Sequence, residues 1–338
     1  MWEVQLLTAT QAIEKTMAVA LYRFSICLGI ALAFVFATLA GAGMGFAVGS
    51  LSSSLSGFGQ VGGLVGFIAC GVIIYWARGR LLFSVRCPQI AAAVEQMEGR
   101  LMPRGAKQIA AATSLVRRRF QDVSLLAGLD RQIKSVLADL LHATPQVSGW
   151  MPSIAHLPTA RLLNALVARP VAYTDAVILA FQLREEEQNI WRSGQTALVL
   201  YAQHFKVLLK NALILYALMY AALIAVFFLM LEPVGWVDEA LPESMGWWRY
   251  LFALVLAWII KAGFFEPIAE ISMTQLYFDL IKGQESSPES EEKLSRLSPS
   301  FQAIKERAPI DLPESPPEGA ESDPNAESAQ EGESRQED

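Results

Sequence analysis

The sequence predicts an all-α, polytopic membrane protein with about four transmembrane helices, cytoplasmic amphipathic or re-entrant helices and a disordered acidic tail. Two observations lead to this prediction. Residues 24–77 contain no charged side chain, and 53% of the 338 residues are hydrophobic. A helix rises about 1.5 Å per residue and the hydrocarbon core of a bilayer is roughly 30 Å thick, so one span needs about 20 residues. The uncharged stretch is therefore long enough for two spans.

These two spans are predicted to form a hairpin, because the Ser/Gly-rich segment 50–57 between them ends helices. Small residues recur every four positions along the first span, which places them on one helix face where another backbone can approach closely. We expect that face to pack the hairpin, with homodimerisation or a glycine-lined permeation path as alternatives. The helix-packing residues are Gly29, Ala33, Ala37, Gly41, Gly45, Gly49, Gly62 and Gly66.

The first region, residues 1–86, adds an N-terminal segment to this hairpin. Apolar residues in segment 1–22 are spaced as in an amphipathic helix at the inner membrane surface, or as in a plain extension of the first span. Basic residues are dense after the second span, beginning with Arg78, Arg80 and Arg86, whereas the serine turn has no charge. The positive-inside rule then predicts a multi-pass inner-membrane protein with both termini in the cytoplasm.

The second region, residues 87–210, is predicted to be a cytoplasmic or interfacial set of amphipathic helices. Its basic triplet Arg117, Arg118 and Arg119 suits contact with anionic lipid headgroups, and a solvated face is the alternative. Nucleic acid is not an expected partner, since no aromatic residues are interleaved with the basic ones. Segment 160–183 is apolar but interrupted by charges, which favours an interfacial or re-entrant helix pair covered by protein.

The third region, residues 211–282, is predicted to be a second transmembrane hairpin, with its first helix at 211–231 and its second beginning near Trp248. Ionisable side chains within a span are candidates for function, because leaving them unpaired in lipid is costly. The candidate intramembrane polar site consists of Lys261, Glu266 and Glu270, with Asp175 as a partner from the preceding region. The alternative is structural: Lys261 would extend to the inner headgroups and the glutamates would lie at the interface.

The fourth region, residues 283–338, is predicted to be a disordered acidic tail. From residue 285 onward it has 15 acidic and 5 basic residues, a local net charge of −10. Within it, Leu294 to Ile304 has apolar residues at helical spacing and is the part expected to fold on a partner or against the basic central helices.

Several short stretches resemble the choline transporter-like family. Residues 174–180 and 193–200 are similar to the region of that family where an Asn-Ala-Tyr-Ile element precedes a Ser-Ala-Lys-Asp-Ala segment and a span. Residues 262–265 and 274–279 are similar to its final span, and residues 66–74 to an earlier one. The chain has about four clear spans where the family has about ten, and Asp175-Ala176-Val177 stands in place of Asn-Ala-Tyr. The resemblance implies a shared helical core.

No catalytic, metal-binding or cofactor-binding motif is found. The three histidines are isolated, and the three cysteines lack metal or disulfide spacing. We therefore expect neither enzymatic activity nor a cofactor. The sequence favours a transporter-like protein that moves a small organic solute or a lipid-related molecule. The alternative is a membrane-embedded scaffold that binds lipid or protein partners through its cytoplasmic helices and acidic tail. The expected partners are membrane lipids and, through the tail, a second copy of the chain or another protein.

Overall fold

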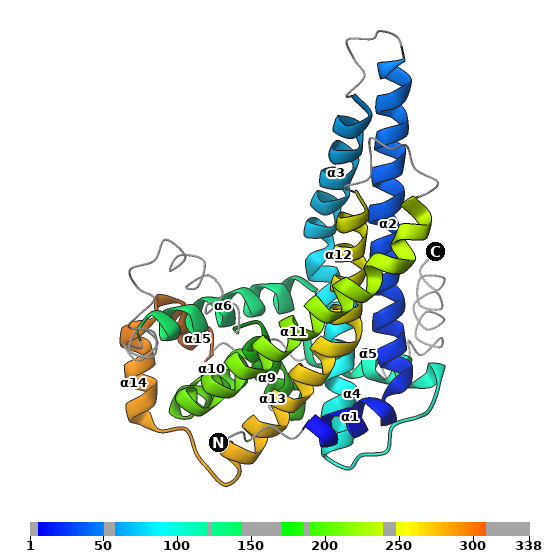
Figure 1. The fold of residues 1–338 in the computed structure, drawn as a ribbon. Helices are drawn as coiled ribbons and strands as arrows, with labels where there is room; N and C mark the ends of the chain where they lie inside the picture. Colours follow the sequence, from blue (N-terminus) through cyan, green and yellow to red (C-terminus); the bar gives the residue numbers. More distant parts are fainter. Residues whose placement is uncertain are drawn as a thin grey trace, which may run out of the picture.

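The structure is a computed structural model, and it describes residues 6–50, 58–120, 123–143, 171–185, 189–238 and 248–308. Within these ranges the regular elements are all helices. Two long hairpins rise from one side of a helical body, as Figure 1 shows. The all-α class predicted from the sequence is therefore confirmed. The serine turn and the loop between the third and fourth spans lie outside the described residues.

Among the residues that the structure describes, four helical runs are long and apolar enough to cross a membrane. They are α2 (Met17–Gly49), α3 (Phe58–Leu81), α11 (Phe205–Asp238), and α12 (Trp248–Ile260) continued through α13 (Glu266–Ile281). Large apolar side chains on them remain outside the protein core, with Phe36 67%, Ile73 69% and Phe228 64% exposed. Such a surface is stable in hydrocarbon and unfavourable in water. The chain is thus a multi-pass membrane protein.

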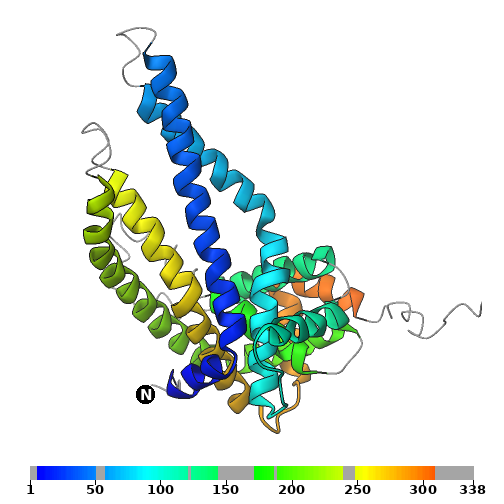
Figure 2. The same ribbon diagram turned by 90° about the vertical axis from the view of Figure 1, so that its right-hand side faces the viewer.

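Small residues bring α2 and α3 together at the end of the hairpin farthest from the body (Figure 2). A Cβ placed on Gly41 would lie 2.2 Å from the carbonyl oxygen of Gly62, and one on Gly62 would lie 2.2 Å from that of Gly41. A Cβ on Gly66 would meet the Ala37 carbonyl at 2.1 Å, and one on Gly45 the carbonyl of the residue at the start of α3. Only glycine allows backbones to approach this closely.

The predicted packing face of α2 extends farther toward the body than the observed contact between α2 and α3. Gly29 has no atom of the described chain within 4 Å of a Cβ placed on it, and Ala33 is exposed. The reason is geometric, because α3 diverges from α2 as both helices approach the body (Figure 2). Gly49, at the other end of α2, is half-buried.

The N-terminal segment forms its own short helix, α1 (Leu6–Lys15), before α2 begins at Met17. Its small-residue face, Ala9 and Ala12, packs on Ala93 and Ile271. Leu7 points outward and is 81% exposed. The buried face of α1 thus rests on protein, and its position at the inner membrane surface stays a prediction.

The body is built from α4 (Cys87–Met97), α5 (Ala106–Phe120), α6 (Val123–His142), α9 (Val171–Arg184) and α10 (Ile190–Gln203). Helix α9 is its centre, with residues 176–180 completely buried and with contacts to α4, α6, α10 and α13. A helix enclosed on all sides needs no polar face, which explains the continuous apolar run in its sequence. The part of the predicted helix pair before residue 171 lies outside the described residues.

The first part of the predicted disordered tail is helical. Two helices, α14 (Pro288–Leu297) and α15 (Pro299–Arg307), follow the last span and pack on α6 and α10. Leu294, Phe301 and Ile304 are 1%, 0% and 0% exposed, so this segment folds against the central helices, one of the two options expected. Residues 309–338, the remainder of the predicted disordered tail, lie outside the described residues.

Candidate functional site

Each hairpin enters the body through one turn of π-helix. The first, η2 (Leu82–Arg86), follows α3, and the second, η4 (Lys261–Phe265), separates α12 from α13. Both end two residues before a proline, Pro88 and Pro267. Proline has no N–H, and its ring clashes with the carbonyl four residues earlier, so the helix widens just upstream. Turns of this kind are often found at functional sites.

The second bulge leaves a carbonyl group for a partner from another helix. In η4 the N–H of Glu266 donates to the carbonyl of Lys261, five residues earlier. In the same register the carbonyl of Ala262 would face Pro267, which has no N–H to donate. Nε of Arg23 donates to this carbonyl oxygen instead, at 3.1 Å. A side chain of α2 thereby joins the first hairpin to the second.

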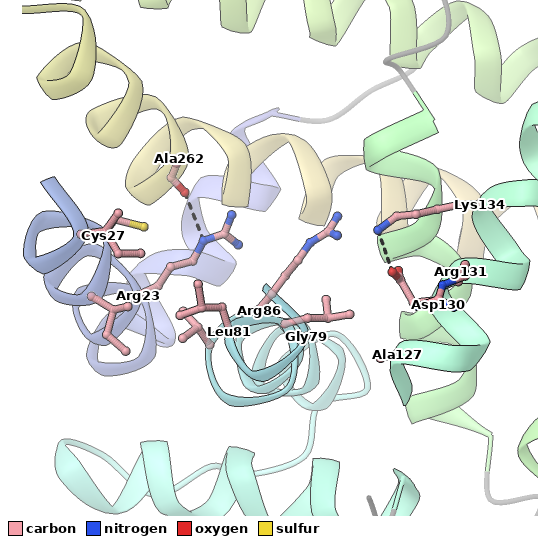
Figure 3. A pocket seen from close by; sticks show the side chains of 14 residues that line it. Arg23, Cys27, Gly79, Leu81, Arg86, Ala127, Asp130, Arg131, Lys134 and Ala262 are labelled. Carbon is pink, nitrogen blue, oxygen red and sulfur yellow. Dashed lines mark hydrogen bonds and ion pairs between the residues drawn. The ribbon is translucent and has the colours of Figure 1, made fainter. Parts of the chain in front are cut away.

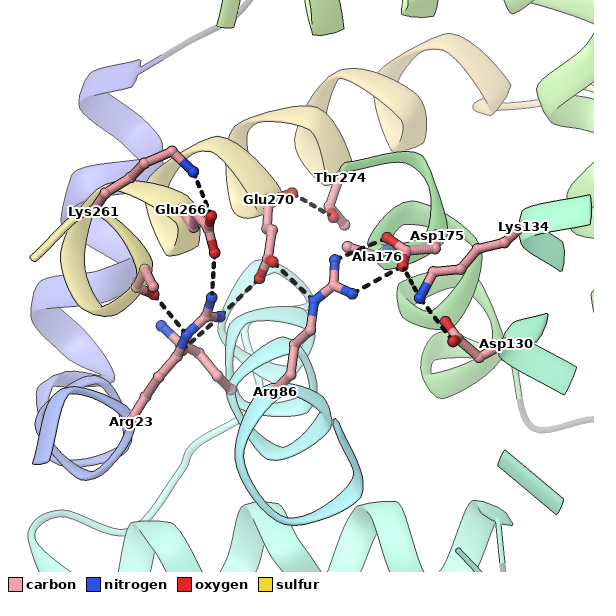
Figure 4. Close-up of polar contacts among 12 residues, drawn as sticks. Arg23, Arg86, Asp130, Lys134, Asp175, Ala176, Lys261, Glu266, Glu270 and Thr274 are labelled. Atoms are coloured by element: carbon pink, nitrogen blue, oxygen red, sulfur yellow. Dashed lines mark hydrogen bonds and ion pairs between the residues drawn. The ribbon is translucent and has the colours of Figure 1, made fainter. Parts of the chain in front are cut away.

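Arg23 belongs to a chain of ion pairs in which positive and negative groups alternate (Figure 4). It contains four cations and four carboxylates from α2, η2, α6, α9, η4 and α13, so their formal charges cancel. In order, the residues are Lys261, Glu266, Arg23, Glu270, Arg86, Asp175, Lys134 and Asp130. We call this set the ion-pair chain.

The half of the ion-pair chain nearer the membrane connects the two hairpins. Lys261 is only 4% exposed; its Nζ lies 2.5 Å from Oε1 of Glu266 and 5.0 Å from the ring centre of Tyr220. Nη2 of Arg23 lies 3.5 Å from Oε2 of Glu266, and its Nη1 lies 2.9 Å from Oε2 of Glu270. Lys261 thus points into the protein, contrary to the interpretation in which it extends to the headgroups.

The other half connects the hairpins to the body. Nε of Arg86 donates to Glu270 at 2.8 Å, and its two terminal nitrogens hold both oxygens of Asp175 at 2.8 and 2.9 Å. Nζ of Lys134 lies 3.1 Å from Asp175 and 2.7 Å from Asp130. Paired guanidinium and carboxylate forks of this kind are the strongest hydrogen-bonded ion pairs in proteins.

The two aspartates differ in how firmly they hold a proton. Burial alone would raise the pKa of Asp175, but Arg86 and Lys134 outweigh it and hold that pKa below its usual range. For Asp130, burial raises the pKa and the charge of Asp175 raises it further, while Lys134 compensates only in part. As the pH falls, Asp130 is therefore neutralised before Asp175.

A cavity of about 490 Å³ lies beside the ion-pair chain, between α2, the end of α3 and α6 (Figure 3). Of the ion-pair chain, Arg23, Arg86, Lys134 and Asp130 reach its surface. Another cation, Arg131, lines it as well. The remaining lining is largely apolar: Ile26, Cys27, Ile30, Gly79, Leu81, Leu82, Val85, Ala127 and Ala262. The cavity is thus amphipathic, with cations from α2, η2 and α6 and apolar residues from the same elements.

The four residues of the predicted polar site all belong to the ion-pair chain. Their partners differ from the prediction, because Asp175 pairs with Arg86 and Lys134 and does not contact Lys261 directly. Arg23 and Arg86 provide the links that the sequence interpretation missed. The sequence offers a partial signal, since Pro88 follows the first hairpin and Pro267 interrupts the last helix of the second, close to these charges.

The predicted lipid-binding triplet has two kinds of member. Arg117 and Arg118 are exposed on α5. Arg119 is half-buried, and its Nε donates to the carbonyl oxygen of Gln182 at 2.7 Å. Arg119 therefore connects α5 to α9 inside the body, and its assignment to lipid headgroups is corrected.

The residues and contacts above describe a multi-pass membrane protein with a buried ionic junction and an adjoining amphipathic cavity. Comparison with protein-family models, with curated proteins and with solved structures gave no match. Among the described residues, no group of three or more His, Cys, Asp or Glu side chains has the arrangement of a metal site.

Proposed function

We propose that this chain is a transporter-like protein of the inner membrane that admits a small organic or lipid-related molecule to the cavity beside the ion-pair chain. The observation that supports this most is the position of the ion-pair chain. One continuous set of ion pairs joins both hairpins to the body, and one side of it forms the cavity surface.

The energetics of buried charge favour a functional reason for this arrangement. Replacing a buried ion pair by packed hydrophobic residues is often neutral or stabilising, so stability alone does not require eight charged groups here. Glu270 contacts Arg23 through one oxygen and Arg86 through the other. A shared carboxylate of this kind can exchange one arginine for the other if the hairpins move relative to the body. The π-turns are places where the helical hydrogen-bond pattern changes, so we expect the hairpins to bend there.

The orientation follows from the distribution of basic residues. With the arginine-rich body in the cytoplasm, both termini lie inside, and the cavity lies near the inner headgroups. The resemblance of several stretches to the choline transporter-like family agrees with a transport role.

Transport is tested with the full chain reconstituted into liposomes, in two parallel assays: movement of fluorescent phosphatidylglycerol between leaflets and uptake of labelled choline. Lys261→Ala and Glu266→Ala each break the first ion pair and are expected to reduce the activity of the wild type by about tenfold or more. Lys206→Ala removes an exposed lysine of α11 and should leave it unchanged. Activity that survives both substitutions in the ion-pair chain argues against the proposed role.

A scaffold function is the second candidate, and the C-terminal helices favour it. Helix α14 presents Glu289 and Glu292 to solvent, with side chains 76% and 64% exposed, on the surface of the body. Removing both charges, in the double variant Glu289→Gln and Glu292→Gln, should then strongly reduce capture of a protein partner from solubilised membranes while leaving both transport assays unaffected. Partner capture by this variant at the wild-type level would argue against α14 as the binding element.

A further inference from the structure

The geometry points to the cavity beside the ion-pair chain as a binding site for an anionic phospholipid, with the headgroup phosphate held by its cations and an acyl chain against its apolar residues. This inference rests on the proposed function and names the class of ligand that the site accepts.

Four cations line the cavity, whereas Asp130 is the acidic residue among the lining residues. Arg23, Arg86 and Lys134 reach the cavity surface, whereas Glu266, Glu270 and Asp175 do not line it. The guanidinium and ammonium groups therefore stand between the cavity and three of the four carboxylates in the ion-pair chain. A phosphate in the cavity would meet hydrogen-bond donors first, and arginine matches phosphate oxygens particularly well.

Arg131 supplies the positive charge that the ion-pair chain does not neutralise. It lines the cavity on the exposed side of α6, and no ion pair to it is found among the described residues. The eight residues of the ion-pair chain cancel formally, so Arg131 leaves the site with one net positive charge. An anionic headgroup is thereby favoured over a zwitterionic one. Lys134, whose side chain is 44% exposed, can turn an N–H toward the same ligand.

The apolar side of the cavity is provided by Ile26 and Ile30 of α2 and by Leu82 and Val85 of η2. It lies where α2 and α3 have separated: the helices touch through Phe34 and Phe67, with ring centres 4.8 Å apart, and then diverge toward the body (Figure 2). A molecule could therefore reach the cavity sideways between the two helices.

The depth of the site suits a headgroup. Arg23 is the last charged residue before the uncharged stretch 24–77, so it marks the edge of the hydrocarbon, where lipid phosphates lie. A volume of about 490 Å³ is within the range of roughly 300 to 1,000 Å³ usual for small-molecule sites. It is large enough for a glycerophosphate group and the first part of one acyl chain.

The test is lipid binding to the purified full-length chain in maltoside micelles, followed by native mass spectrometry. Three probes are titrated: dioctanoyl phosphatidylglycerol, dioctanoyl phosphatidylcholine and free glycerol phosphate. We expect phosphatidylglycerol to bind most tightly. Equal affinity of phosphatidylcholine would overturn the anionic preference, and equal affinity of glycerol phosphate would overturn the assignment to a lipid.

Two variants examine the two sides of the cavity separately. Arg131→Gln removes the unneutralised cation and should weaken phosphatidylglycerol binding by about threefold to tenfold, with Arg118→Gln, an exposed arginine outside the cavity, as its control. Ile30→Trp fills the apolar side and should reduce binding similarly, and its control is Leu32→Trp on the lipid-facing side of α2.

The outcomes separate this inference from the proposed function. Unchanged affinity in both Arg131→Gln and Ile30→Trp overturns the cavity as the lipid site, even if the transport assays succeed. Selective, variant-sensitive binding supports the site even if neither transport assay shows activity, which would count against transport alone.

Discussion

Replacing Arg86 with leucine should destabilise the protein strongly. Arg86 makes one hydrogen bond to Glu270, at 2.8 Å, and two to Asp175, at 2.8 and 2.9 Å. Leucine removes all three bonds and leaves three cations among four carboxylates in the ion-pair chain. Loss of one partner from a buried ion pair costs about 3–5 kcal/mol, because the other charge stays buried without compensation. We expect the free energy of unfolding to fall by about this amount.

A second substitution should restore part of that loss. Combining Arg86→Leu with Asp175→Asn leaves three cations and three carboxylates, with Arg23 still on Glu270 and Lys134 still on Asp130. The asparagine oxygen can still accept from the N–H of Ala176, as Asp175 does at 2.8 Å. The double variant should therefore be more stable than Arg86→Leu alone, by roughly 1–3 kcal/mol.

Unfolding of the purified chain in mixed micelles, followed by tryptophan fluorescence, measures these differences. Arg80→Leu, at an exposed position near the same junction, is the matched control and should change stability by about 0.5 kcal/mol or less. A double variant as unstable as the sum of its single substitutions would refute the reasoning, since the two charges would then act independently.

Three further predictions concern other parts of the molecule. Gly41→Ala should lower the thermal stability of the hairpin, because its methyl group would lie 2.2 Å from a carbonyl oxygen of α3. Gly29→Ala should be neutral or slightly stabilising, since no atom of the described residues lies near that position. Equal changes in thermal stability for the two variants would contradict close packing at Gly41. The pKa of Asp130 is raised in the folded state, so the folded state holds this proton more tightly than the unfolded state. The stability of the wild type relative to Asp130→Asn should therefore fall as the pH rises from about 4. A stability difference that is constant or increases with pH in denaturation titrations would contradict this. Phe301→Ala should destabilise the packing of α15 on the body by about 3–5 kcal/mol and expose α15 to trypsin. The control Gln302→Ala, at an exposed position, should leave the cleavage rate unchanged. Similar cleavage rates in the two variants would show that Phe301 does not hold α15 on the body.

The class of protein could be read from the sequence because it depends on local composition. A helix that crosses hydrocarbon needs a long, mostly apolar sequence, so most of the spans are visible as stretches without charge, such as residues 24–77. The close contact of Gly41 with Gly62 was foreseeable for a similar reason, since spacing along one helix defines a face. The extent of that contact was not, because divergence of α3 from α2 separates Gly29 from its expected partner.

The candidate site was only partly foreseeable. Lys261 and Glu266 stand out because they interrupt an apolar run, and their pairing needs only the one π-turn that separates them. Arg23 and Arg86 look like ordinary residues at the edges of spans. Their role depends on where α2 and η2 lie relative to α13.

By itself, the sequence determined the all-helical class, the four spans and the small-residue face of the first hairpin, because each follows from the solvent that a local segment can tolerate. The tertiary structure alone decided which charges meet: Arg23 and Glu270 are 247 residues apart and lie 2.9 Å from one another. A buried ion pair requires a particular arrangement of several helices in space, and no local pattern specifies that arrangement. The same arrangement leaves the cavity between α2, η2 and α6, which Arg131 lines together with apolar residues.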